Sequence, residues 1–122
     1  MLKSSLIALS AAGMLTGVTL GMTGTAMAQD DMAATWTKYQ EAVRVAELCR
    51  YMKHDAAQWA KMGPYIDGKV NHEIGGGQRL TLIEEAKSGA WQAARVQGCE
   101  SEGAKTLLSL YDAELAPLAG GM

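Results

Sequence analysis

Beyond residue 29, apolar residues recur along the chain at three- and four-residue steps, and this spacing constrains the fold more than any other feature. In the first such segment the residues at this spacing are Met32, Trp36, Tyr39, Val43 and Ala46. The pattern puts apolar side chains on one face of an amphipathic helix over about residues 31–53. No stretch shows the period-two alternation of a half-buried strand. The sequence therefore predicts an all-α protein.

A second helix is predicted to begin at Asp55. Gln58 follows three residues later, which is the spacing of a capping box. Gly63-Pro64 then interrupts the segment, and because proline lacks an N–H and clashes with the preceding turn, we expect a kink or a restart there. The four-residue spacing from Ile66 to Ile74 extends this helix to residues 75–77, where three glycines stop it.

Two further helices follow. Apolar spacing predicts a third helix over about residues 78–97, closed by Gly98 in the left-handed conformation. Ser101 is a good N-cap for a fourth helix, which Pro117 ends. Its expected inward residues are Ala104, Leu107, Leu108, Tyr111 and Leu115.

The only two cysteines, Cys49 and Cys99, fall at the ends of the first and third predicted helices. No C-x-x-C pair is present, so a structural disulfide is favoured over a redox pair. The bond would hold two helix C-termini together, so these helices should run parallel, with the second returning between them and the fourth returning after the third. This predicts a small up-down-up-down four-helix bundle with one disulfide. Closing so long a loop contributes about 4 kcal/mol in the chain-entropy model.

Residues 1–28 have the layout of a secretory signal peptide. Lys3 precedes an apolar run over residues 6–20, and the segment closes on Ala26-Met27-Ala28, a small-x-small cleavage site. The alternative is an uncleaved membrane anchor, but glycines and threonines interrupt the run. We therefore predict cleavage after Ala28 and a single helical domain over residues 29–122. The expected location is periplasmic or secreted, where the cysteines can pair.

Composition limits the classes of partner that the protein is expected to bind. Removing 28 of the 122 residues leaves 94, enough for one domain with a modest core. Loss of Lys3 changes the formal net charge from −2 to −3. The sequence contains no Lys/Arg cluster, which argues against nucleic acid and anionic membrane as partners. Nothing after residue 29 is apolar enough for stable membrane insertion.

Residues that could carry chemistry are few. Met52, His54 and His72 could serve a metal or small-ligand carrier, although His54 at a helix junction is more simply an exposed polar residue. His72 with Glu84 and Glu85 could assemble a small hydrolase. No metal-ligand spacing, nucleophile elbow or haem motif is present, so we predict no cofactor, no metal site and no catalytic residue.

Three tryptophans remain as a possible interaction surface: Trp36, Trp59 and Trp91. They lie on three different predicted helices and could form one core cluster, or leave one ring exposed for a partner. The chain is similar in size, class and cysteine number to small periplasmic acid-stress chaperones, which implies chaperone-like binding. We predict a non-enzymatic protein that binds a partner protein or an apolar ligand through an apolar surface, with little dependence on salt. The alternatives are the carrier and the hydrolase.

Overall fold

Helices account for every regular element that the structure describes. The computed structural model describes residues 28–120, and no strand occurs in that range. The elements are α2 (Gln29–Arg50), α3 (Ala56–Gly68), α4 (Gly76–Trp91), η2 (Gln92–Val96), α5 (Glu102–Leu110), η3 (Tyr111–Leu115) and α6 (Ala116–Ala119). Two of them, η2 and η3, are π-helical turns that continue α4 and α5. The predicted all-α fold, a small bundle of four helical segments, is confirmed.

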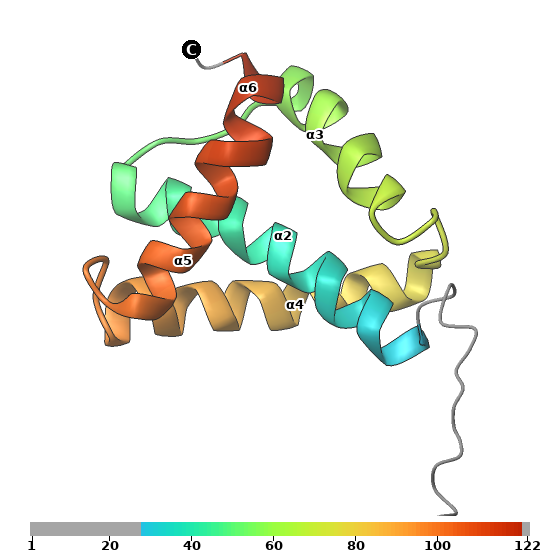
Figure 1. The fold of residues 1–122 in the computed structure, drawn as a ribbon, viewed down its shortest axis with the longest axis horizontal. Coiled ribbons are helices and arrows are strands. Elements are labelled where there is room, and N and C mark those ends of the chain that lie inside the picture. Colours follow the sequence, from blue (N-terminus) through green and yellow to red (C-terminus); the bar gives the residue numbers. More distant parts are fainter. Residues whose placement is uncertain (1–27, 121–122) are drawn as a thin grey trace, which may run out of the picture.

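Helices α3, α4 and α5 pack against α2, with α4 along the bottom of the view and α3 at the upper right (Figure 1). α2 crosses α4, and the two run in the same direction, from the right of the view to the left. α2 packs most extensively against α4 and then α5, whereas α3 packs mainly against α6 at the other end of the chain. The predicted disulfide joins Cys49, near the end of α2, to Cys99, in the turn after η2. It holds the C-terminal ends of α2 and of the α4–η2 rod together, as the cysteine positions predict.

The core lies along the inner face of α2. Its largest fully buried side chains are Trp36, Met62, Ile66, Leu115, Val43, Val45 and Val70. They come from α2, α3, the turn after α3, and η3, so the core joins all these segments. Of the five residues predicted to face inward from the last helix, Leu108 is partly buried and the other four are buried.

The predicted helix boundaries that depend on capping are confirmed. Asp55 accepts a hydrogen bond from the Gln58 amide, and the Gln58 side chain accepts one from the Asp55 amide, both at 2.8 Å. The Ser101 hydroxyl accepts a hydrogen bond from the Ala104 amide at 3.3 Å. Gly98 has a φ of +103°, a conformation that glycine adopts without a side-chain clash.

Of the expectations for α3, the restart at Gly63-Pro64 and the extension to residue 74 are wrong. The helix continues through Pro64 to Gly68. It also stops well short of residue 74, and turns follow it. Glycine is a poor helix former, and Asn71 and His72 have left-handed backbone conformations that end the helix. Val70 and Ile74 are nevertheless buried, so turns satisfy the apolar spacing that predicted a longer helix.

Candidate functional site

The three tryptophans have three different environments. Trp36 is 2% exposed, and its indole N–H donates to Asp67 Oδ1 at 3.0 Å. Trp59 is partly buried, with its ring 6.2 Å from the His54 ring. Trp91, at the end of α4, is 53% exposed. Of the predicted interaction residues, therefore, Trp91 offers most of its ring to a partner, whereas Trp36 is part of the core.

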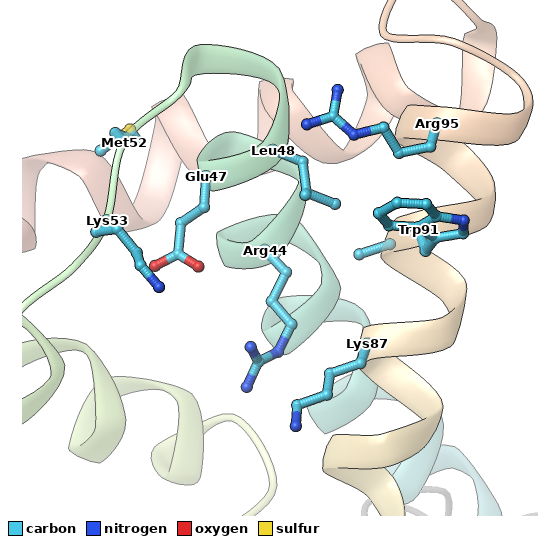
Figure 2. A pocket seen from close by; sticks show the side chains of 9 residues that line it. Arg44, Glu47, Leu48, Met52, Lys53, Lys87, Trp91 and Arg95 are labelled. Atoms are coloured by element: carbon cyan, nitrogen blue, oxygen red, sulfur yellow. The ribbon is translucent and has the colours of Figure 1, made fainter.

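Trp91 lines a groove between the C-terminal halves of α2 and α4 (Figure 2). The groove encloses about 420 Å³, a size typical of small-ligand and side-chain sites. The residues lining it are Arg44, Glu47, Leu48, Met52, Lys53, Lys87, Ala90, Trp91 and Arg95. In Figure 2, Leu48 points from α2 toward the Trp91 ring, and Arg95 reaches from η2 toward α2. The apolar side chains thus lie between charged ones.

The charge on this groove is almost entirely positive. Its basic residues are Arg44, Lys53, Lys87 and Arg95, and its one acidic residue is Glu47. The Arg95 guanidinium lies 5.9 Å from the ring centres of both Trp91 and Tyr51, within the range of a cation–π contact. Tyr51 is 84% exposed, so this pair extends the aromatic surface beyond the groove.

Arg44 also borders a second cavity on the same helix. This cavity, of about 290 Å³, is lined by Trp36 and Trp59 among others. The Arg44 Nε is buried and has no hydrogen-bond partner within residues 28–120. Trp91 therefore lines one cavity and Trp36 and Trp59 line the other, and Arg44 lines both.

His54 is not the exposed junction residue that the sequence suggests. Its side chain is fully buried. Nδ1 lies 2.8 Å from Glu47 Oε2, and Nε2 lies 2.7 Å from the Tyr111 hydroxyl. The His54 backbone N–H also donates to the same Glu47 oxygen at 3.0 Å. One imidazole thus ties the end of α2 to η3, across a connection with no regular structure.

The order Tyr111, His54, Glu47 has the form of a nucleophile, a base and an orienting carboxylate. Its burial argues against catalysis. Tyr111 is 3% exposed, so no substrate reaches its hydroxyl. Desolvation raises the pKa of Tyr111, which makes its phenolate harder to form. The arrangement is best explained as a satisfied buried polar network.

The residues considered for a carrier or a hydrolase are not brought together. His54 and His72 lie at opposite ends of α3, roughly 20 Å apart along a helix of 13 residues. Met52 lines the Trp91 groove. Glu84 is exposed and pairs with Lys87 at 3.4 Å, while Glu85 is exposed on the cavity beside the start of α2. Within residues 28–120, no group of three or more His, Cys, Asp or Glu side chains could hold a metal ion.

Sequence reasoning missed the four basic residues of the groove. They are scattered over more than fifty positions, so no linear cluster marks them. One local signal was available, because Lys87, Trp91 and Arg95 recur at four-residue spacing and therefore follow one stripe of a helix. The contributions of Arg44 and Lys53 depend on the crossing of α2 and α4.

Comparison with protein-family models, curated proteins and solved structures gives no match. Among the helices of the described range, none is long and apolar enough to cross a bilayer.

Proposed function

We propose that this protein acts by binding rather than by catalysis, and that the Trp91 groove receives an apolar part of a partner protein or ligand. The observation that carries the proposal is the exposure of Trp91. The other two tryptophans pack into or against the core, whereas Trp91 is exposed in a groove that Leu48 and Met52 also line. An exposed aromatic ring beside apolar side chains is a common anchor for a partner.

The energetics are adequate for such a role. Removing apolar surface from water is worth about 25 cal/mol per Å², and a large aromatic ring can bury well over 100 Å². A central tryptophan at an interface commonly contributes 2 kcal/mol or more. One ring can therefore determine whether a complex forms, once the cost of association is met.

The proposal includes export. Cleavage after Ala28 would leave the described fold intact, because α2 begins at Gln29. The Cys49–Cys99 bond is compatible with an oxidising compartment. Intact mass of the exported protein should match residues 29–122, less ~17 Da if Gln29 has cyclised. A product that retains residues 6–20 would favour the membrane anchor.

Binding can be tested with the neutral apolar dye Nile red. We expect the dye to gain fluorescence with the wild-type protein and to lose most of that gain with Trp91→Ala. The matched control is Leu80→Ala, which removes a 69% exposed apolar side chain from the other end of α4. Because both side chains are exposed, both variants should fold.

Three outcomes would contradict the proposal. If the dye does not bind the wild-type protein, the groove is not an apolar binding site. If Trp91→Ala and Leu80→Ala reduce dye binding equally, the dye binds exposed apolar surface in general. Turnover of any substrate in a way that depends on His54 would contradict the non-enzymatic part.

A further inference from the structure

The Trp91 groove is positively charged although the protein as a whole has a net negative charge. Four of the chain's 11 Lys and Arg residues line it, against one of the 13 Asp and Glu residues. That one, Glu47, is already engaged by the backbone and ring of His54. The groove therefore has more cationic side chains than carboxylates available to pair with them.

Most of these cations have no partner within the chain. In the part of the chain that the structure describes, no carboxylate lies within 4.0 Å of Arg44, Lys53 or Arg95. Elsewhere the basic residues Arg50, Lys69 and Arg79 each have a carboxylate partner at 2.7–3.4 Å. Lys38, Lys61 and Lys105 also have no carboxylate within 4.0 Å among residues 28–120, so the groove is distinguished by gathering three unpaired cations around one cavity.

Lys87 already has an exposed partner, Glu84, at 3.4 Å, whereas Arg95 has no carboxylate partner within residues 28–120. The spacing of these two cations indicates the form of an acidic ligand that could meet both. Lys87 and Arg95 are two helical turns apart, or ~12 Å at 1.5 Å per residue, with Trp91 midway between them. A ligand with one carboxylate can meet one of these two residues. A segment with acidic residues on either side of an apolar one can meet both while covering Trp91.

The surroundings of the groove also favour a large partner. Tyr51 is 84% exposed beside Arg95 and extends the aromatic surface past the cavity. The groove volume of about 420 Å³ would hold a small ligand, but the groove is open on the side where Trp91 is 53% exposed, which leaves room for a larger partner. Tyrosine, tryptophan and arginine together are also the residues most enriched at protein–protein hot spots.

We propose that the Trp91 groove docks an acidic amphipathic segment of another protein. An apolar side chain of that segment packs between Leu48 and Trp91, and its carboxylates pair with Lys87 and Arg95. This inference rests on the proposed binding function and gives the partner its chemistry. It replaces the expectation of salt-independent binding, because charge pairs at an exposed rim are screened by salt.

The test uses a synthetic amphipathic peptide with Leu and Glu at helical spacing, and a peptide of equal length with Lys in place of Glu. Binding is followed by calorimetry and by the blue shift of Trp91 fluorescence. We expect the Glu peptide to bind and the Lys peptide not to bind. We also expect the affinity to fall about tenfold or more between low and high salt, since at least two charge pairs are screened.

A matched pair of charge variants locates the site. Lys87→Glu with Arg95→Glu should weaken binding of the Glu peptide by at least about tenfold, because attraction at the rim becomes repulsion. Lys61→Glu with Lys105→Glu changes the net charge equally at exposed residues that do not line the groove. This control should retain near wild-type affinity.

Several results would overturn the inference while the proposed function stands, since Nile red would still bind in a Trp91-dependent way. They are equal affinity for the two peptides, binding of decanoate or of phosphatidylglycerol vesicles in place of the Glu peptide, and self-association that buries Trp91. If the dye and both peptides all bind independently of Trp91, the proposed function fails as well.

Discussion

The two sides of α2 near its C-terminal end differ in how far their polar and aromatic side chains are paired within the protein. On the side that faces η3, polar groups are paired within the chain. Arg50 makes two hydrogen bonds to Asp112, at 2.7 and 2.9 Å, and His54 meets the Tyr111 hydroxyl. On the side that faces α4, the Trp91 groove has an exposed ring, and three of its four cations have no carboxylate partner within residues 28–120. Glu47 belongs to both sides, since it lines the groove and holds His54.

The comparison separates residues that maintain the fold from residues available for binding. A buried polar group without a partner costs about 1–3 kcal/mol, so the η3 side is costly to disturb. On the groove side, Lys87, Trp91 and Arg95 are exposed, so replacing them leaves no buried polar group unpaired. Changes on the η3 side should therefore reduce stability, and changes on the groove side should reduce binding. Four predictions test this separation, from the largest expected effect to the smallest.

The disulfide should have the largest effect on stability. Replacing both Cys49 and Cys99 with Ala removes a cross-link between residues 50 positions apart, worth about 4 kcal/mol in the chain-entropy model. For a domain of this size that corresponds to a fall in Tm of roughly 15–30 °C. Thermal unfolding followed by circular dichroism measures it.

The same double variant should still bind Nile red at low temperature, because neither cysteine lines the groove. An unchanged Tm, or free thiols in the natively exported protein, would argue against a stabilising bond.

His54 should have the second largest effect. His54→Asn shortens the side chain so that it no longer bridges Glu47 and Tyr111, and we expect a loss of about 1–3 kcal/mol in the free energy of unfolding. His72→Asn is the matched control, since His72 is exposed and asparagine tolerates its left-handed backbone. It should change stability by less than about 0.5 kcal/mol. Urea denaturation of the two variants gives the difference, and equal losses would refute the structural role of His54.

Local signals in the sequence were enough to predict much of the fold. The capping box at Asp55, the Ser101 cap and the conformation of Gly98 each depend on one or two neighbouring residues, and all are confirmed. The end of α3 could not be predicted in the same way. Val70 and Ile74 keep helical spacing and are buried, yet they reach the core from turns. Apolar spacing predicts which side chains are buried. It does not predict whether those residues lie in a helix or outside one.

The site was harder to predict because it depends on contacts between distant segments. His54 is buried through Tyr111, 57 positions away, and no local pattern around either residue indicates the pairing. The groove likewise takes Arg44 from α2 and Lys87 from α4. Which of the three tryptophans stays exposed follows from the crossing of these two helices, and sequence periodicity does not specify that crossing.

The third prediction concerns the loss of stability at acidic pH, which we expect to depend on Glu114 in η3. Hydrogen bonds donated by Tyr65 and Tyr39, at 2.5 and 2.8 Å, lower the pKa of Glu114 below that of a free glutamate, and Lys69 adds to this shift. A lowered pKa means that the stabilisation is present above the unfolded-state pKa and is lost as pH falls through the folded-state pKa. The pKa of Asp112 is lowered in the same sense by its hydrogen bonds from Arg50.

Stability should therefore decline as the pH falls below about 4.5, the ordinary glutamate range. In Glu114→Gln, stability at pH 7 should be lower and the decline on acidification shallower than in the wild type. Glu100→Gln removes an exposed carboxylate that has no hydrogen bond or ion pair within the described residues, and it should keep the wild-type profile. Tm measured across the acidic range distinguishes these profiles. A Glu114→Gln profile parallel to the wild type would contradict the role of these bonds.

The smallest expected change in stability is that of Trp91→Ala, and it is the most direct challenge to the comparison. Trp91 is 53% exposed and makes no hydrogen bond within the described residues, so its removal should change the free energy of unfolding by about 0.5 kcal/mol or less. Removing the buried Trp36 should instead cost roughly 3–5 kcal/mol, because it leaves a cavity and removes the hydrogen bond to Asp67 Oδ1, although Arg79 still pairs with that carboxylate. If Trp91→Ala unfolds the protein as readily as Trp36→Ala does, the ring is part of the core and the two sides of α2 do not differ. If its stability is unchanged while binding of the Glu peptide is lost, the groove side of α2 serves recognition, and the fold is maintained from the other side.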